Sequence, residues 1–198
     1  MKTALLLSGG MDSLAIAWWK HPDIAITIDY GQKAAEAEKR ASAAVCQEIG
    51  IEHHILHIDC SSLGSGDMVL AKPDPAAPAS DWWPYRNQLL ITLAAMKCIG
   101  LGVQKLLIGT VLSDGSHIDG TPEFVQLMDK LLRLQEGGLQ VEAPAIGLST
   151  ADIIRQSELP PGILAWAHSC HKANTPCWNC RGCNKYRETY DEIGLDLA

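Results

Sequence analysis

Residues 5–13 read Leu5-Leu6-Leu7-Ser8-Gly9-Gly10-Met11-Asp12-Ser13, an apolar strand that passes through a short turn of small residues into a helix. Glycines in such a turn leave room for the backbone to approach an oxyanion, and the free N–H groups at the positive end of the helix complement its charge. Ser8 and Ser13 add hydroxyl donors, and Asp12 is placed to hold a Mg²⁺ ion that bridges phosphates. The stretch therefore predicts a phosphate-binding loop on an α/β sheet.

This loop differs from the one that kinases use. Their loop requires Gly-x4-Gly-Lys-Ser/Thr, which is absent here, so transfer of a γ-phosphate is not the expected reaction. Ser-Gly-Gly-x-Asp-Ser instead resembles the pyrophosphatase loop of ATP-dependent adenylating enzymes, which cut between the α and β phosphates. The alternative for this stretch alone is an ordinary glycine-rich turn between a strand and a helix.

Size and composition limit the class of protein. The chain has 198 residues, of which 47% are hydrophobic and 20% charged, values typical of a globular protein with one sizeable core. A formal net charge of −7 argues against a broad surface for nucleic-acid backbones, so we expect a small ligand and no direct contact with nucleic acid. Residues 5–7 are too few for an export signal and no stretch approaches a membrane span, so we expect a cytoplasmic location.

Short apolar runs alternate with helical patterns along the chain. Strands are expected at residues 3–7, 24–28, 54–58, 105–108 and 139–143. This alternation predicts an α/β fold built on a parallel, five-stranded, Rossmann-like sheet.

Helix signals lie between these strands. Helices are expected over residues 33–49 and 87–99, each followed by a glycine, and further helices begin at residues 121–123 and 149–152. Residues 61–80 are rich in Gly, Pro, Ser and Ala and are longer than a typical connection. They form an active-site lid or, alternatively, a disordered insertion.

Polar residues follow the second and fourth predicted strands, at the carboxyl edge of the sheet where ligands of open α/β folds bind. After the second strand, Asp29 is suited to a ribose hydroxyl or a metal, and Lys33 to phosphate charge, although an ordinary turn is the alternative. After the fourth strand, Asp114, His117 and Asp119 are able to read ring N–H groups or to take a proton. His117 is the candidate general base, and a solvated loop histidine is the alternative.

Aromatic residues stand next to an arginine in Trp82-Trp83-Pro84-Tyr85-Arg86-Asn87. This combination suits a planar, anionic ligand, because the rings stack on it and the guanidinium forks its carboxylate. The alternative is that the tryptophans pack in the core or the lid and that Arg86 is a surface charge.

Four of the seven cysteines form the series Cys170-x6-Cys177-x2-Cys180-x2-Cys183. Four thiolates this close match tetrahedral zinc, with Gly182 relaxing the turn and Arg181, Lys185 and Arg187 offsetting the negative charge. Three cysteines at this spacing also occur in iron–sulfur proteins, so a cluster and a metal-free site are alternatives. Four protein ligands occupy all the coordination positions of a tetrahedral zinc ion, which indicates a structural site. The other three cysteines are expected in the hydrophobic core.

Taken together, these landmarks resemble the 7-cyano-7-deazaguanine synthase (QueC) family of PP-loop ATP pyrophosphatases. The resemblance runs through nearly the whole chain and rests on residues 8–13, 29–32, 84–87, Asp114 with Asp119, Glu123-Phe124, and the motif from Ser169 to Cys183. It implies a sheet of the adenine-nucleotide alpha hydrolase type over residues 1–160, with a zinc-binding segment, residues 161–198, packed on it. It further implies ATP-dependent adenylation of 7-carboxy-7-deazaguanine, attack by ammonia to give the amide, and ATP-driven dehydration to the nitrile.

The site residues expected from these motifs fall into four groups. Catalytic roles are expected for Asp12, Lys33, Arg86 and Asp114. ATP and Mg²⁺ are expected on Leu7, Ser8, Gly9, Gly10, Met11, Asp12, Ser13, Asp29, Tyr30 and Gly31. The deazaguanine is expected against Trp82, Tyr85, Arg86, Asn87, Asp114, His117, Asp119 and Glu123. Zn²⁺ is expected on Cys170, Cys177, Cys180 and Cys183.

The chain departs from the family pattern on the substrate side. After Gly31-Gln32 the family has Arg-His and a nearby Glu, whereas here Lys33-Ala34 follow, and Glu36 and Glu38 are not clearly in register. Where the family pattern is Asp-Cys-Arg-x-Glu-Phe, this chain has Gly120-Thr121-Pro122 between Asp119 and Glu123, which we expect to leave that side of the site more open.

These departures keep other functions open. Transfer of the activated deazaguanine to a protein amine, as in QueC-like members associated with antiviral defence, is the first alternative. A tRNA-thiolating adenylating enzyme and a nonenzymatic nucleotide-binding scaffold are the others. Ammonia would come from solution or from another chain, because 198 residues leave no room for a glutaminase domain. A homodimer is expected.

Overall fold

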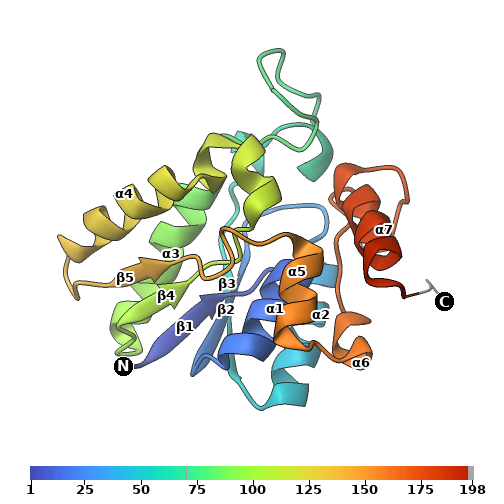
Figure 1. The fold of residues 1–198 in the computed structure, drawn as a ribbon. Helices are drawn as coiled ribbons and strands as arrows, with labels where there is room; N and C mark the ends of the chain where they lie inside the picture. The colour runs from blue at the N-terminus through green and yellow to red at the C-terminus, as the bar shows by residue number, and fades with distance from the viewer. Residues whose placement is uncertain (70, 196–198) are drawn as a thin grey trace.

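A computed structural model describes residues 1–69 and 71–195 of the chain. In this part of the chain, five parallel strands form one sheet in the order β3-β2-β1-β4-β5 (Figure 1). The strands are β1 (Thr3–Leu6), β2 (Ile24–Asp29), β3 (Glu52–His57), β4 (Lys105–Leu107) and β5 (Gln140–Glu142). The predicted α/β fold with a parallel five-stranded sheet is confirmed, and the strand boundaries differ only at the ends.

Helices connect the strands. They are α1 (Met11–Lys20), α2 (Ala35–Ile49), α3 (Arg86–Gly100), α4 (Pro122–Arg133), α5 (Thr150–Ser157), α6 (Pro161–Leu164) and α7 (Arg181–Ile193). Two predicted starts are confirmed by their caps, because Thr121 Oγ1 accepts from Phe124 N at 3.2 Å and Ser149 Oγ accepts from Asp152 N at 3.0 Å. Helix α7 begins within the cysteine motif, with Cys180 as its N-cap and Cys183 in its first turn, and it was not expected from the sequence.

Helices cover both faces of the sheet, because successive strand residues point to opposite sides (Figure 1). On one face, Ile24, Ile26 and Leu106 share a core with α3 and α4. On the other face, Leu5 and Leu107 share a core with α1, α2 and α5, and Tyr190 of α7 joins this core. The C-terminal helix is therefore packed directly on the sheet domain.

The strand order reverses direction at the centre of the sheet. The chain moves outward from β1 through β2 to β3, and then crosses back to place β4 on the other side of β1. A crevice forms at the carboxyl ends of the strands where such a reversal occurs. Ser8 follows β1 and Gly109 follows β4, so the phosphate loop lies at this crevice.

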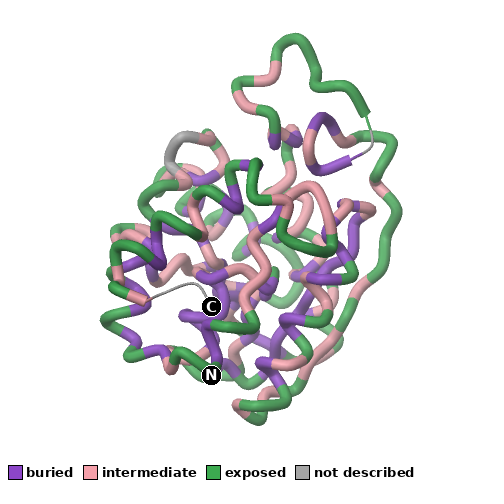
Figure 2. The backbone as a smooth tube through the Cα atoms, turned by 90° about the vertical axis from the view of Figure 1, so that its right-hand side faces the viewer, coloured by how far each residue is buried: buried purple, intermediate pink, exposed green. Residues whose placement is uncertain are grey.

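The predicted lid region contains two short 3₁₀ helices, η1 (Ser61–Leu63) and η2 (Gly66–Met68). Its ends are anchored, because Met68 and Trp83 are buried and the Trp83 ring meets Tyr30 edge to face at a centroid distance of 4.9 Å. Between them, residues 71–80 form a mostly exposed loop that projects from the body (Figure 2). Met68 and Asp81 reach the crevice, which favours the lid interpretation over a disordered insertion.

None of the helices described is both long enough and apolar enough to cross a membrane.

Candidate active site

A cavity of about 600 Å³ opens at the carboxyl edge of the sheet. The phosphate loop, the start of α3, the loop after β4, the ends of the lid and the cysteine segment all contribute to its wall. Twelve predicted ligand-binding residues line it, together with Cys170 of the cysteine motif: Leu7, Ser8, Gly10, Met11, Asp12, Ser13, Tyr30, Arg86, Asn87, Asp114, His117 and Asp119. The fold therefore gathers the phosphate loop and parts of four other motifs into one site.

The two glycines of the phosphate loop occupy different environments. Gly9 has a φ of +76°, and a Cβ there would lie 2.8 Å from the main-chain oxygen of Glu38 in α2. Gly10 is the extended N-cap of α1, and a Cβ there would meet nothing closer than Ser8 Oγ at 3.5 Å. Gly9 thus allows the loop to pack on α2, while Gly10 faces the cavity at the N-terminus of a helix, where an anion is favoured.

Asp12 meets a lysine from the far end of the chain. Lys185 of α7 donates to Asp12 Oδ2 at 2.8 Å and lies 3.7 Å from Asp114 Oδ1. Asp12 Oδ1 is buried and has no hydrogen-bond partner among the described residues. Two carboxylates beside a phosphate loop, one with an oxygen left over, form a donor set that Mg²⁺ prefers.

Burial and mutual attraction act together on this group. Burial raises the pKa of Asp114, and the charge of Asp12 adds to the rise while Lys185 opposes it. Burial works to lower the pKa of Lys185, but Asp12 and Asp114 outweigh it, so the pKa of this lysine lies above its ordinary value. Lys185 therefore stays charged beside the phosphate loop.

Arg86 presents a guanidinium to the cavity from the first turn of α3. Its Nη1 lies 2.8 Å from Met68 Sδ, and no carboxylate in residues 1–69 or 71–195 forms an ion pair with it. Burial works to lower the pKa of Arg86, but Tyr30 and Asp119 lead the groups that hold it above its ordinary value. An enclosed guanidinium without an ion pair is suited to an anionic ligand, and a planar carboxylate matches its fork.

Asp119 and His117 are already engaged within the protein. Asp119 Oδ2 accepts from Asn87 N at 3.1 Å, which fixes the start of α3 and hence Arg86. His117 Nε2 lies 3.2 Å from Arg181 Nη1, and because arginine only donates, this nitrogen is the acceptor. His117 therefore uses on Arg181 the lone pair that a general base would need.

Arg181 also joins the lid to the cysteine segment. Its Nη1 donates to Asp81 Oδ1 at 3.0 Å, and His171 Nδ1 lies 3.3 Å from Asp81 Oδ2. Burial works to raise the pKa of Asp81, but His171 and Arg181 hold it far below the usual range. The lid end and the segment that follows Cys170 are thus held together by charge across the mouth of the cavity.

Seven predicted site residues do not line the cavity. They are Gly9, Asp29, Gly31, Lys33, Trp82, Tyr85 and Glu123. Asp29 pairs with Lys39 at 2.8 Å and with His57 at 3.2 Å. Lys33 is half-buried, its main-chain nitrogen donates to Met68 O at 2.9 Å, and the cation that reaches the phosphate loop is Lys185.

The loop after β4 is closed tightly at Gly120, where the sequence predicted a more open side. Gly120 is buried, and a Cβ there would collide with the main-chain oxygen of Asp114. The glycine is needed for this close contact, so it holds the loop against the cavity wall.

Two residues missed by the sequence interpretation are Lys185 and Glu38. Arg181 and Lys185 stand four residues apart, so on a helix they share one face, which is a signal that the sequence did offer. For Glu38 the sequence offered two acids of unclear register, and only the packing of α2 shows which one lines the cavity.

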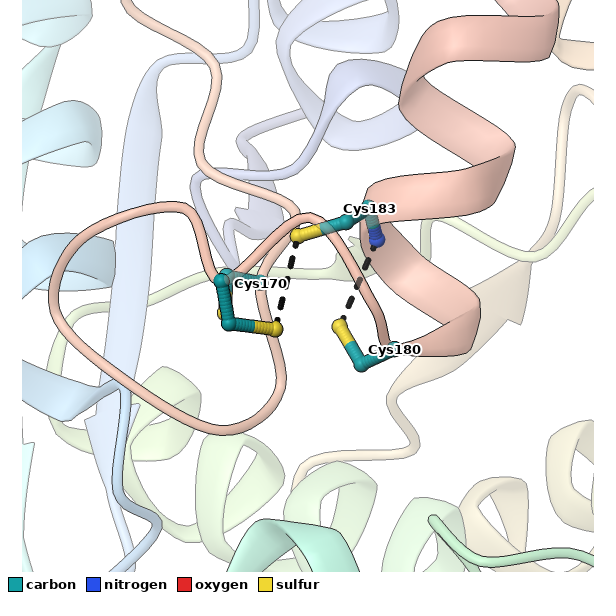
Figure 3. A group of neighbouring side chains, drawn as sticks. Cys170, Cys180 and Cys183 are labelled. Carbon is teal, nitrogen blue, oxygen red and sulfur yellow. Dashed lines mark hydrogen bonds between the residues drawn. The ribbon is translucent and has the colours of Figure 1, made fainter.

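The four thiols of the cysteine motif converge beside the N-terminus of α7 (Figure 3). The sulfur atoms of Cys170, Cys177, Cys180 and Cys183 all lie within 4.8 Å of one another. A tetrahedral zinc ion with Zn–S bonds of about 2.3 Å needs sulfurs about 3.8 Å apart, and Cys177 and Cys183 are separated by 3.9 Å. The residues therefore fit a four-coordinate metal.

Main-chain groups support this cluster. The N–H groups of His171 and Cys183 point to Cys180 Sγ at 3.5 and 3.4 Å, as donors to a thiolate do. Gly182 is required by a close approach, because a Cβ there would collide with the main-chain oxygen of Ser169. This close approach holds the two ends of the cysteine segment together at the cavity wall.

The parallel sheet, its order and the pyrophosphatase-type loop define an α/β fold of the PP-loop type. The family model described as "Queuosine biosynthesis protein QueC" matches residues 2–194, and the chain belongs to this family. The chain is accordingly a QueC-like enzyme of the PP-loop class.

Curated relatives named 7-cyano-7-deazaguanine synthase support this membership. The proteins from Methylococcus capsulatus and Desulforudis audaxviator are 33% and 30% identical, over 98% of this chain and 96% and 98% of theirs. The protein from Methanosarcina barkeri is 28% identical over 98% of this chain and 96% of its own. That last alignment spans 221 positions, more than the 198 residues here, so this chain is a shortened member of the family.

A solved structure shares the fold. The U34-tRNA thiolase NcsA from Methanococcus maripaludis, determined with its [4Fe-4S] cluster, matches with a TM-score of 0.58 and 21% identity. The match covers 97% of this chain and 65% of that chain.

Proposed function

We propose that this chain uses ATP to adenylate the carboxylate of 7-carboxy-7-deazaguanine and passes the acyl group to an amine. With ammonia the product is the amide and then, after ATP-driven dehydration, the nitrile named in the curated relatives. The observation that carries the proposal is one cavity that joins a phosphate loop with an unpaired Asp12 oxygen to an Arg86 guanidinium without an ion pair.

The phosphate end of the cavity is suited to ATP. The N-terminus of α1 and the hydroxyls of Ser8 and Ser13 are available to the pyrophosphate, with the hydroxyl oxygens 3.2 Å apart. Asp12 and Asp114 would hold Mg²⁺, which, when bound, neutralises charge on the phosphates. Lys185 would exchange its contact with Asp12 for a phosphate oxygen, which brings a positive charge to a loop that has none of its own.

The opposite end is suited to the acid. Adenylation brings a carboxylate against an α-phosphate, so two anions must be held together. Arg86 would fork the carboxylate, and the oxygen of Asp119 that Asn87 does not use would accept from the guanine-like N–H edge. Enclosure strengthens both contacts, because it removes competing water.

The metal of the cysteine site is proposed to be zinc. Four thiolates complete a tetrahedral shell and leave no open position for chemistry, so the ion would hold the segment that carries Arg181 and Lys185. The cluster in the NcsA structure makes iron the alternative. Metal analysis of protein purified without air would find about one zinc per chain, and a brown protein with iron and sulfide would contradict the assignment.

The test of the function uses the purified chain with ATP and the carboxylated deazaguanine. We expect exchange of labelled pyrophosphate into ATP that depends on the deazaguanine acid, and release of AMP when ammonium is added. Absence of both would overturn the proposal. A peptide amine competing with ammonium identifies the acceptor: nitrile or amide as the only product rejects protein modification, and a mass adduct on a protein rejects the simple synthase. A requirement for added tRNA would support a thiolase instead.

A further inference from the structure

A carboxyl group that the proposed activation step does not use lines the cavity at Glu38. It stands in the first turns of α2, whose backbone packs on Gly9 of the phosphate loop. Its side chain shares the wall with Ser8, Gly10 and Arg86. Glu36, two residues earlier, is exposed and pairs with Lys39 at 2.6 Å. Only one of the two acids therefore turns inward.

A buried amide fixes the orientation of this carboxylate. Gln32 Nε2 donates to Glu38 Oε2 at 2.7 Å and to Ile28 O at 3.2 Å, while Gln32 Oε1 accepts from Tyr30 N at 2.9 Å. These three contacts hold the amide in one orientation, because a flipped amide would place donor against donor. No other described residue hydrogen-bonds to Glu38, so its second oxygen, Oε1, is available to a ligand.

Several charged groups face Glu38. Arg86 approaches from α3, His171 from the cysteine segment, and Asp29 and Tyr30 from the end of β2. Burial raises the pKa of Glu38, and although Gln32, His171 and Arg86 oppose the rise, the pKa stays above its ordinary value. None of the ion pairs formed by described residues includes Glu38. It is an enclosed carboxylate with a free oxygen and a raised proton affinity.

We propose that Glu38 is the general base of the amine-transfer step, an inference that rests on the proposed function. An amine reaching the site as a cation must lose a proton before its nitrogen can attack. Glu38 Oε1 would take that proton between the phosphate loop and Arg86, where the acyl adenylate would lie. Gln32 is then a positioning residue, because it acts through the carboxylate.

Ammonium gives a first proton to Glu38, and the nitrogen lone pair of the ammonia so formed makes the C–N bond at the acyl carbon. The nitrogen then gives a second proton to the departing phosphate oxygen, as the bond from the acyl carbon to that oxygen breaks with its electron pair and releases AMP. The proton held by Glu38 passes to solvent after the products leave. No oxidant or further reactant is needed.

The experiment separates activation from transfer in Glu38→Gln, with Glu36→Gln as the matched control. We expect pyrophosphate exchange driven by the deazaguanine acid to stay within about threefold of the parent, since Glu38 takes no part in that step. The ammonium-dependent rate should fall about 10²–10⁴-fold, the usual contribution of a general base. Hydroxylamine, which is uncharged near neutral pH and needs no base, should restore product formation. Glu36→Gln should match the parent in all three assays.

Three results would overturn the inference. They are an ammonium rate within tenfold of the parent, a parallel loss of exchange in Glu38→Gln, and a hydroxylamine rate that falls as far as the ammonium rate. If the variant does not fold, the parent gives the same information. Its rate per ammonium cation should show an acid limb that is absent from the rate per free hydroxylamine, and equal profiles would reject the base. A parent without pyrophosphate exchange would instead refute the proposed function.

Discussion

The two walls of the cavity are held by different forces. The phosphate-loop wall, residues 8–13, sits on the core of the sheet, where Leu5, Leu7 and Leu14 are completely or almost completely buried. The cysteine wall, residues 168–185, has little apolar core of its own beyond the cysteines and reaches the first wall through His168 N, which donates to Gly9 O at 2.9 Å. Burial of apolar surface stabilises the first wall, and we expect metal binding to stabilise the second.

The charges of the site are divided between these walls. Asp12 belongs to the wall that folds with the core, and its partner Lys185 belongs to the wall that depends on the cysteines. The proposed anion-binding site is therefore complete only when both walls are folded. Substitutions in one wall therefore test whether the other wall responds.

The largest effect is expected for Cys180→Ser. Metal binding by such a cluster is worth on the order of 10 kcal/mol, so its loss should release the segment that carries Arg181 and Lys185. We expect loss of the metal, a lower melting temperature and loss of pyrophosphate exchange. Cys60→Ser, a half-buried cysteine outside the cluster, is the control and should keep its metal. Unchanged melting of Cys180→Ser would show that the wall folds without the ion.

Asp12→Asn perturbs the core-supported wall and should act on activity far more than on stability. The carboxylate has an unpaired oxygen and adds little to the fold, but we propose it as a metal ligand. AMP release should fall by about a hundredfold or more, comparable to loss of one strong electrostatic contact at a reacting group. Asp191→Asn, exposed on α7, is the control. AMP release at the parent rate would remove Asp12 from the site.

A pair of lysine variants distinguishes the expectation drawn from the sequence from the arrangement in the structure. Lys185→Ala removes the cation 2.8 Å from Asp12, whereas Lys33→Ala removes one that does not line the cavity. We expect Lys185→Ala to lower pyrophosphate exchange about tenfold to a hundredfold, the range for loss of a charge-assisted hydrogen bond. Lys33→Ala should lower it less than about threefold. The reverse order would mean that the cavity rearranges when ATP binds.

Arg86→Lys keeps the positive charge but removes the two parallel N–H donors of the guanidinium. Lysine is a point charge that cannot donate two parallel hydrogen bonds to a carboxylate, so the apparent affinity for the deazaguanine acid should fall about tenfold. The apparent affinity for ATP, measured in the same titrations, should change little. Equal weakening of both ligands would place Arg86 on the phosphates.

The smallest effect is expected for Ser149→Ala. Ser149 caps α5 on the face of the sheet that carries α1, away from the cavity lining. Loss of an N-cap costs about 1 kcal/mol, which lowers the melting temperature of a chain of this size by about 2–4 °C. AMP release at 25 °C should stay at the parent rate. A lower rate would show that a change in α5 affects the site through α7.

Local patterns determined much of this protein. Apolar runs predicted all five strands, and the clearest of them is β2, because a strand buried on both faces is a run of apolar residues wherever it lies in the chain. Two helix starts were predicted from Thr121 and Ser149, because a cap depends on contacts within four residues. The phosphate loop and the cysteine series could likewise be recognised from the sequence, because the ligand groups of each lie close together in the chain.

Only the tertiary structure decided which charged side chains meet. Asp12 and Lys185 are separated by 173 positions, and no local pattern relates them. Glu38 faces the cavity and Glu36 does not, because the packing of α2 on Gly9 sets which side of the helix turns inward. Direction on a helix changes by about 100° per residue, so a register uncertain by one residue leaves the site undetermined until the helix is docked.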